Sequence, residues 1–257
     1  METSDIFDIK MPSAFQLAAF ESVDSTNDEL RRRALDGAPA GTVVCALEQT
    51  KGRGRRGRTW VSERGNLFCS ILQRPAVSLA EASKISFVSA LAIHDAILEA
   101  VDGFDCDVKC KWPNDVLVDG YKVSGILLES QALQGQNMLD WLIIGIGINL
   151  HHSPADTPYP SGYINAYRDQ ALSQAQMLEL LLKHFAQWFE RWQSLGFQAI
   201  REAWLHRAKG IGTEIAVNLS NEKLIGTFET LDQDGALVLQ TSEGKRVITA
   251  GDVFFER

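Results

Sequence analysis

TVVCALEQTKGRGRRGR, residues 42–58, joins an apolar run to a basic, glycine-rich run. The first part, Thr42 to Leu47, carries no charge and is rich in β-branched residues, which predicts a buried strand. The second part, Gly52 to Arg58, alternates glycine, which adopts any backbone angle, with arginine, which binds carboxylate or phosphate bidentately. The pattern therefore predicts an anion-binding loop at the exit of a strand.

Two interpretations of the basic loop follow from its charge. Lys51 and four arginines place five positive charges within eight residues of a chain whose formal net charge is -8, which favours one specific anion as the ligand. The alternative is a basic surface loop or an RNA-binding Arg-Gly segment. Aromatic residues are absent until Trp60 and no long repeat follows, both unlike disordered RNA binders. The negative net charge also argues against general attraction to nucleic acid.

The composition is that of a globular protein. At 257 residues, 45% hydrophobic and 23% charged, the chain is long enough for one large domain and one small domain. The segment Met1 to Lys10 is acidic and has no apolar core, so it predicts no secretory signal. The longest apolar run, Trp141 to Ile148, is shorter than the roughly 20 residues of a membrane span. We therefore expect a cytoplasmic protein that does not insert into membranes.

Four cysteines, Cys45, Cys69, Cys106 and Cys110, occur without a C-x-x-C pair. Three of them lie in or beside apolar stretches, where a thiol packs as a small hydrophobe. Cys106 and Cys110 form at most half of a metal site, because no histidine or second cysteine pair lies near them in sequence. We expect packing roles and no zinc.

Outside the junction, periodicity predicts further helices and strands. A helix begins at the Asp24-Ser25-Thr26-Asn27 segment, where Ser25 and Asp28 have capping-box spacing, and ends near Leu35. Trp141 to Leu150 predicts a central strand, whose Gly145 and Gly147 leave one face bare for close approach of a ligand. Three further elements are predicted: strands at 16–21 and 66–72, and a helix at 83–101.

Residues 116–123 predict a hairpin. Asp119-Gly120 separates two apolar runs and accepts the positive φ angles of a type I′ turn. Strict alternation then places Lys122 and Ser124 on one face, opposite to Tyr121 and Val123. We expect that face to be either solvent-exposed or part of a site.

The last third of the chain changes in character. A helix with apolar residues at helical spacing begins at Ser173 and is ended by Gly196, and a second short helix ends near Ala208. Four short β-rich runs separated by Asn, Asp and Gly follow, at 214–219, 223–231, 237–241 and 245–249. We predict a first domain at residues 1–209 and a small β-barrel domain at residues 210–257.

Lys111-Trp112-Pro113-Asn114-Asp115 is a second candidate site segment. The Asn114 amide both donates and accepts hydrogen bonds, which suits an adenine edge, and Lys111 suits phosphate. Asp115 suits an incoming amine. For each residue alone, turn formation or a surface ion pair explains the residue type equally well.

Taken in order, these segments resemble the motif set of biotin protein ligases. The motifs are residues 24–27, 48–60, 111–115, 122–127 (Lys-Val-Ser-Gly-Ile-Leu) and 145–149 (Gly-Ile-Gly-Ile-Asn), and the resemblance is strong from Phe20 to Leu150. It implies an α+β fold: a catalytic domain with a mixed β-sheet and helices, related to class II aminoacyl-tRNA synthetases and lipoate ligases, followed by a small SH3-like β-barrel. It also implies a two-step reaction. Biotin and Mg-ATP give biotinyl-5′-AMP, and biotin then passes to one lysine of a biotin carboxyl carrier protein, usually that of acetyl-CoA carboxylase.

The resemblance also implies roles for particular residues. Biotin-binding residues would be Ser25, Thr26, Asn27, Gln49, Arg53, Gly54, Arg55, Lys122 and Gly125. ATP- or adenylate-binding residues would be Arg55, Arg58, Trp60, Lys111, Asn114, Lys122 and Asn149. Catalytic residues would be Lys122, which stabilises charge at the phosphorus, with Arg55, Lys111 and Asp115. The Mg²⁺ ligands, the role of Arg56 and the specific role of Arg58 stay unassigned.

One expectation concerns what this chain does not do. Repressor-type ligases carry a winged-helix DNA-binding domain before the Asp-Ser-Thr-Asn motif, whereas 23 residues precede Asp24 here, so we expect no operator binding. A homodimer is compatible with the family. The rival functions are a lipoate or other acyl ligase on the same fold, and a non-catalytic RNA-binding module, which leaves Lys111, Lys122 and Asn149 without a role.

Overall fold

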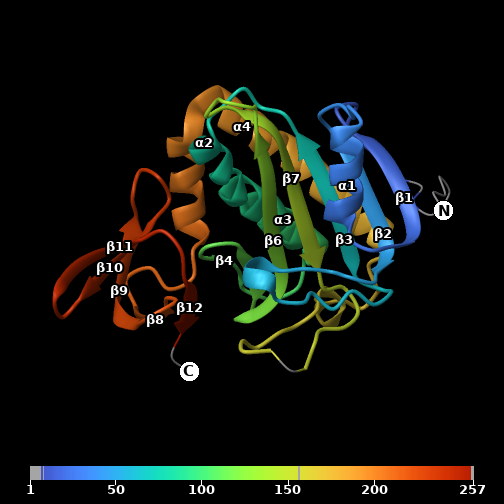
Figure 1. Ribbon diagram of the computed structural model, residues 1–257. Helices are drawn as coiled ribbons and strands as arrows, with labels where there is room; N and C mark the ends of the chain where they lie inside the picture. The colour runs from blue at the N-terminus through green and yellow to red at the C-terminus, as the bar shows by residue number, and fades with distance from the viewer. Residues whose placement is uncertain (1–6, 8, 156, 256–257) are drawn as a thin grey trace.

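The structure, a computed structural model, describes residue 7 and residues 9–155 and 157–255. Most of the acidic segment at 1–10, for which the sequence predicts no secretory signal, lies outside these residues. Two sheets organise the chain, a seven-stranded sheet and a five-stranded sheet formed by residues 214–255 (Figure 1). Among the described residues, no helix is both long enough and apolar enough to cross a bilayer.

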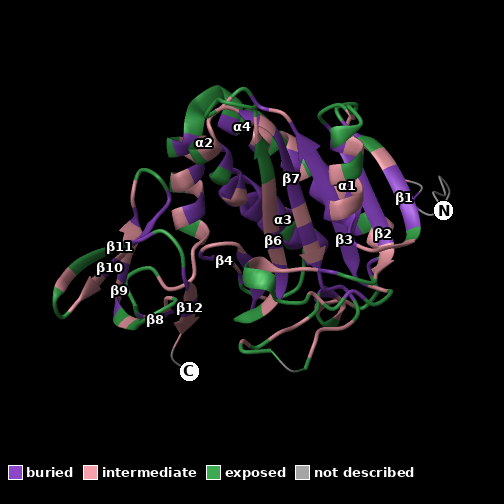
Figure 2. Ribbon diagram, in the orientation of Figure 1, coloured by how far each residue is buried: buried purple, intermediate pink, exposed green. Residues whose placement is uncertain are grey.

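The larger sheet is mixed, as expected. Its order is β1 (Gln16–Val23), β2 (Thr42–Gln49), β3 (Leu67–Gln73), β7 (Leu139–Ile148), β6 (Tyr121–Ala132), β5 (Asp115–Val118) and β4 (Val108–Lys111). β1 and β2 are parallel and are joined by helix α1 (Thr26–Leu35), whereas every other neighbouring pair is antiparallel. β7 lies in the middle of the sheet, which confirms the prediction from its continuous apolar character. Figure 2 shows β3 and β7 largely buried, whereas much of β6 is exposed or intermediate.

Helices cover both faces of this sheet. On one face α1 packs through Leu30 and Ala34 on a small apolar cluster that includes Trp141. On the other face α3 (Ile85–Ala100) and α4 (Gln174–Arg207) form the main core (Figure 1). The single helix predicted at 83–101 is preceded by a separate short helix, α2 (Leu79–Ser83), because Ser78 caps a turn of its own by accepting from the Glu81 N–H.

The predicted capping box of α1 does not form. Ser25 is the N-cap residue, but its side chain makes no capping hydrogen bond, and its backbone N–H donates to Asp24 Oδ1 at 2.8 Å. The Asp28 carboxylate instead binds Arg31 and Arg53. Asp28 therefore accepts hydrogen bonds from two guanidinium groups instead of from the Ser25 backbone N–H that a capping box would use.

The hairpin β5–β6 has the predicted turn and an unpredicted bulge. Asp119 and Gly120 have φ values of 49° and 82°, as a type I′ turn requires. Val116 lies opposite Ser124 and Leu117 opposite Lys122, so Val123 is an extra residue in β6. One inserted residue offsets the alternation. The predicted pairing of Lys122 with Ser124 on one face is therefore wrong, and Lys122 lies with Gly125 beside the pocket described below.

The C-terminal third contains a bent helix and five strands. α4 is interrupted at Gly196 (φ 72°), where the sequence predicts an end, and its second half runs to Arg207. The strands are β8 (Glu214–Asn218), β9 (Lys223–Leu231), β10 (Leu237–Thr241), β11 (Gly244–Ile248) and β12 (Asp252–Phe255). They are all antiparallel in the order β11-β10-β9-β8-β12. Within residues 210–255 no pairing joins β11 to β12, so the sheet is open, and β12 is a strand that the sequence analysis missed.

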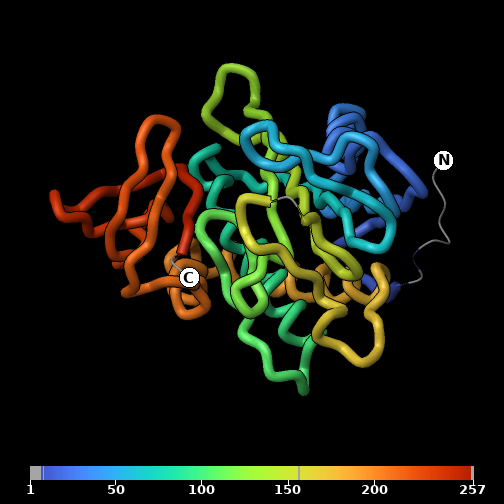
Figure 3. Tube along the Cα trace, turned by 90° about the horizontal axis from the view of Figure 1, so that it is seen from below, coloured from blue at the N-terminus to red at the C-terminus, as the bar shows by residue number. Residues whose placement is uncertain are grey.

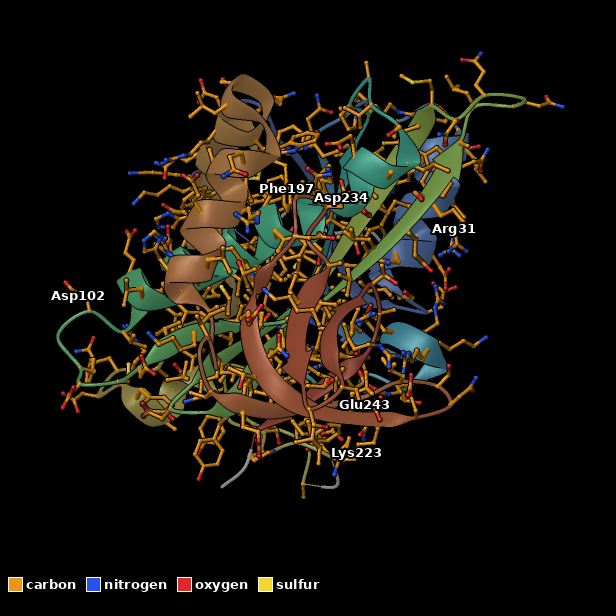
Figure 4. The ribbon with its side chains drawn as sticks, turned by 90° about the vertical axis from the view of Figure 1, so that its left-hand side faces the viewer. Arg31, Asp102, Phe197, Lys223, Asp234 and Glu243 are labelled. Atoms are coloured by element: carbon orange, nitrogen blue, oxygen red, sulfur yellow. The ribbon has the colours of Figure 1, made fainter. Side chains whose placement is uncertain are left out.

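The turn between β9 and β10 fixes this sheet to the first one. Trp112 Nε1 donates to Gly235 O at 3.1 Å, and Gly235 lies against the Phe87 ring. Lys84 binds Asp234 at 3.1 Å and lies over the Phe197 ring; Figure 4 shows Phe197 and Asp234 near one another. Trp112 belongs to the Lys111–Asp115 segment, so the smaller unit contacts, through the Trp112 side chain, the segment that carries candidate site residues.

Candidate active site

A pocket of about 400 Å³ opens at the end of the larger sheet where the Gly52–Arg58 loop lies. The arginine loop and the segment 150–163 lie at this same end, the lower one in Figure 1, and Figure 3 views that end directly. Every residue predicted for the site lines this pocket. They are Ser25, Thr26, Asn27, Gln49, Arg53, Gly54, Arg55, Arg58, Trp60, Lys111, Asn114, Asp115, Lys122, Gly125 and Asn149.

A buried polar network forms one end of the pocket, at the N-terminus of α1. Gln49 Oε1 accepts from the Thr26 backbone N–H at 2.8 Å and from Thr26 Oγ1 at 3.1 Å. Ser70 Oγ lies 2.8 Å from Thr26 Oγ1 and 2.6 Å from Asn27 Oδ1. These polar groups fix one another's orientation, so this end of the pocket is lined by oriented hydrogen-bonding groups. We refer to it as the α1 end.

Two lysines share one carboxylate in the middle of the pocket. Lys122 Nζ lies 2.7 Å from Asp115 Oδ1, and Lys111 Nζ lies 3.8 Å from Asp115 Oδ2. The Lys111 and Asp115 side chains are only 4% and 8% exposed, and the Lys122 side chain is half-buried rather than on an exposed hairpin face. Burial lowers the pKa of Lys111 to about 8, against the opposing charge of Asp115. The cluster thus holds positive charge in a poorly hydrated place, where it acts strongly on an anion.

The arginine loop folds as a tight turn whose side chains all have partners outside it. Gly54 N–H donates to Arg58 O at 2.7 Å, which closes the turn. Arg53 binds Asp28, Arg55 donates to Asn114 Oδ1 at 2.9 Å, and Arg56 and Arg58 bind Asp252 of β12. Burial lowers the pKa of the Arg55 guanidinium, the most enclosed of the four. The loop therefore touches α1, the Lys111–Asp115 segment and the C-terminal sheet at once.

The face of β7 that carries Gly145 and Gly147, predicted to be open to a ligand, is covered by the side chains of two other residues. A Cβ added at Gly145 would overlap the side-chain amide of Asn27, and one added at Gly147 would lie 2.5 Å from the Trp60 ring. Trp60 also lies over Gly125, with the Lys122 ammonium 5.5 Å from its ring centroid. The two glycines thus allow Asn27 and Trp60 to form the floor of the pocket.

Sequence reasoning missed Tyr159 and Asp252, which also line the pocket. The Tyr159 ring covers Lys111, with 3.5 Å from Nζ to the ring centroid, and stacks on Phe254 of β12 at 4.7 Å. Tyr159 lies in a proline-rich segment without periodicity, and Asp252 in a strand that was not predicted. Asn149 Nδ2 donates to Gly162 O at 3.0 Å, so this predicted site residue also anchors that segment.

No group of three or more acidic, histidine or cysteine side chains within the described ranges is arranged to hold a metal ion. The two carboxylates of the pocket, Asp115 and Asp252, each bind cationic side chains.

Comparison with known proteins identifies the family. Residues 19–149 match the biotin/lipoate A/B protein ligase family, and residues 210–256 match the biotin protein ligase C terminal domain. Over 237 residues, 90% of this chain, the sequence is 40% identical to the biotin--[acetyl-CoA-carboxylase] ligase of Paracoccus denitrificans, of which 97% is covered. The chain belongs to the biotin protein ligase family.

Two solved biotin ligase structures share the fold. The biotin protein ligase from Aquifex aeolicus in complex with biotin and ATP superimposes with a TM-score of 0.78 at 28% identity, covering 94% of this chain and 99% of that one. The Leishmania major enzyme in complex with biotinyl-5-AMP gives a TM-score of 0.62 at 27% identity, covering 93% and 100%. In this family member, the motifs that carried the resemblance all meet in one pocket.

Proposed function

We propose that this chain is an ATP-dependent biotin protein ligase. It forms biotinyl-5′-AMP from biotin and ATP and transfers biotin to a lysine of a biotin carboxyl carrier protein, with that of acetyl-CoA carboxylase as the expected partner. One observation carries the proposal. The oriented polar groups of the α1 end, the Lys111 and Lys122 side chains and the arginine loop line a single pocket, which suits a cyclic urea (ureido) ring, a carboxylate and a phosphate in series.

The first step joins the biotin carboxylate to the α-phosphorus of ATP. A carboxylate oxygen forms the new O–P bond, the bond to the β-phosphate oxygen breaks, and pyrophosphate leaves. Lys122 would offset the negative charge that gathers on the phosphorus oxygens, and Lys111 would bind the phosphates. Ser25, Thr26, Asn27 and Gln49 would hydrogen-bond the ureido ring, and Trp60, Asn114 and Asn149 would bind the adenine side.

The second step consumes a mixed anhydride that water also attacks. Arg53 and Gly54 would close over biotin, and Arg55 would hold the phosphate, so the loop would keep the intermediate out of water. The acceptor ε-amine attacks the acyl carbon, AMP leaves, and the amine gives up a proton. Asp115 is the pocket carboxylate that would accept it.

Magnesium enters as part of the substrate Mg-ATP. Since Asp115 and Asp252 bind lysine and arginine side chains, the phosphates themselves would supply most of its ligands. The ion would shield phosphate charge.

Four finer statements belong to the same proposal. The catalytic unit would comprise residues 1–209, with a fold related to class II aminoacyl-tRNA synthetases, and the C-terminal unit residues 210–257, related to SH3-like barrels. We expect a cytoplasmic protein. We also expect no operator binding, which the net charge of -8 supports. A homodimer is compatible with the family and is tested by light scattering.

The test compares two acids. The protein is incubated with ATP and either biotin or lipoate, with and without a carrier domain, and pyrophosphate release and carrier mass are measured. We expect pyrophosphate release and a biotinylated carrier with biotin alone. Activity with lipoate but not biotin would favour the rival acyl ligase, and RNA binding without activity in either assay would favour a binding module.

A further inference from the structure

Arg53, at the start of the arginine loop, is held between two carboxylates that lie outside the loop. Its guanidinium binds Asp28 of α1 through both Nη atoms, with Nη2 at 2.9 Å from Oδ1, and Nη2 also lies 3.3 Å from Glu129 Oε1 of β6. A planar guanidinium facing a carboxylate through two N–H groups is the strongest arrangement available to an arginine. The loop is therefore fixed at this point to the sheet and to α1.

Glu129 connects this contact to the floor of the pocket. Its Oε1 faces Arg53 and Arg31, whereas its Oε2 accepts from Asn27 Nδ2 at 2.9 Å. Asn27 is buried, lies over Gly145 and lines the α1 end. A single carboxylate thus touches both the loop above the pocket and the polar network below it.

The four charged groups form a balanced cluster. Arg31 lies 3.0 Å from Asp28 and 3.0 Å from Glu129, so two cations face two anions; Arg31 is labelled in Figure 4. The two carboxylate side chains are 19% and 23% exposed. Hydrogen bonding from Arg53 is the main cause that lowers the pKa of Asp28. The lowered pKa keeps the Asp28 carboxylate, the main partner of Arg53, ionised across the neutral range.

We propose that Asp28 and Glu129 are positioning residues for the ligase reaction: they hold Arg53, keep the arginine loop closed over the α1 end, and so set how long the acyl-adenylate is retained. This rests on the proposed function. Arg53 acts here as the fastening point of the loop, and its guanidinium is directed at protein carboxylates.

A comparison with the neighbouring acid, Glu29, separates this role from ordinary helix stabilisation. Glu29 is as enclosed as Asp28, with 20% of its side chain exposed, and it also binds two arginines. Its partners, Arg32 and Arg33, lie on α1 itself. Asp28 also binds one arginine of α1, Arg31, but its other partner is Arg53, 25 residues away on the loop. Glu29→Gln is therefore a matched control that removes a carboxylate from the same helix turn without touching the loop.

The experiment measures leakage of the intermediate. With biotin and ATP but no carrier, retained adenylate limits pyrophosphate to one burst followed by slow release. For Asp28→Asn and Glu129→Gln we expect an unchanged burst and a steady release roughly three- to tenfold faster, because a loop that opens more often lets adenylate escape and water cleave it to biotin and AMP. Asp28→Glu, which keeps a carboxylate, restores slow release, and Glu29→Gln behaves as wild type.

Each of the other possible outcomes overturns a defined part of the proposal. No biotin-dependent burst from the wild type removes the proposed function itself. A wild-type burst with unchanged steady release in both Asp28→Asn and Glu129→Gln removes the positioning role. A smaller burst without faster steady release shows that the carboxylates serve biotin binding instead. Thermal unfolding of each variant identifies a folding defect, and equal leakage in Glu29→Gln assigns the effect to α1 stability, which also overturns the proposal.

Discussion

Lys111 is a lysine that the fold has taken almost entirely out of water. Burial lowers its pKa to about 8 from 10.5, although Asp115 acts in the opposite direction. The buried ammonium therefore disfavours the folded state below pH 8, and this penalty is relieved as pH rises from about 8 towards 10.5. Over the same pH interval, Lys111 of the folded protein loses the positive charge with which it would bind a phosphate.

A pH profile follows from this pKa. We expect kcat/KM for ATP to be level below pH 8 and to fall by about tenfold per pH unit above it, as Lys111 loses its proton in the free enzyme. Lys111→Arg keeps its charge to much higher pH, so its profile should lack this fall even if its plateau is lower. The measurement is the initial rate of pyrophosphate release between pH 6.5 and 10. A level wild-type profile, or an unchanged fall in Lys111→Arg, would contradict the assignment.

Lys122 combines a catalytic role with a structural one. Lys122→Ala should reduce adenylate formation by roughly 100-fold or more, the usual effect of removing a group that stabilises transition-state charge. It also leaves the buried Asp115 with only Lys111, 3.8 Å away, so we expect the free energy of unfolding to fall by about 1–3 kcal/mol. Pyrophosphate kinetics and denaturant melts measure the two effects. In Lys122→Met combined with Asp115→Asn, stability should recover while activity does not; recovery of both would assign Lys122 to structure alone.

At the scale of elements, two glycines of β7 lie beneath the pocket floor, Gly145 under Asn27 and Gly147 under Trp60. The methyl group of Gly145→Ala would push on Asn27 at the α1 end, and that of Gly147→Ala on Trp60. This overpacking should lower the free energy of unfolding by about 1–3 kcal/mol in either variant. We expect Gly145→Ala to raise KM for biotin several-fold with little change for ATP, and Gly147→Ala to do the reverse. Each variant is the control for the other, because both add one methyl group to the same strand face. If both raise KM for the same substrate, the assignment of the two ends is wrong.

The elements show where sequence pattern carries information and where it does not. The hairpin turn at Asp119-Gly120 was predictable because its signal is local. The bulge at Val123 depends on how β6 pairs with β5, so alternation along one strand misplaced Ser124. The capping box failed for a similar reason, since Asp28 is bound by an arginine from a distant loop. Local rules thus identified the elements, while long-range charge pairing decided what their side chains do.

At the scale of the whole molecule, the pocket is completed by the C-terminal sheet. Asp252 binds the arginine loop, and two residues along β12 the Phe254 ring stacks on Tyr159. The sequence predicted the pocket residues that belong to family motifs, because those motifs are contiguous. Tyr159 and β12 lacked any such signal, since a proline-rich segment and a four-residue edge strand have no period to read. Tyr159 and β12 contribute to the pocket only because the folded chain brings them next to Lys111 and the arginine loop.

Phe254 should therefore influence Lys111 through the Tyr159 ring. The Tyr159 ring lies over Lys111, and Phe254 supports that ring from the C-terminal sheet. Phe254→Ala removes an aromatic pair worth about 0.5–1.5 kcal/mol and lets water reach Lys111, so the alkaline fall in kcat/KM for ATP should move to higher pH. Phe255→Ala is the matched control, because Phe255 is the next residue of β12 and packs on Gly210 instead. Both variants should lose some thermal stability, but only Phe254→Ala should shift the pH profile; equal profiles would show that the C-terminal sheet supports the pocket without tuning Lys111.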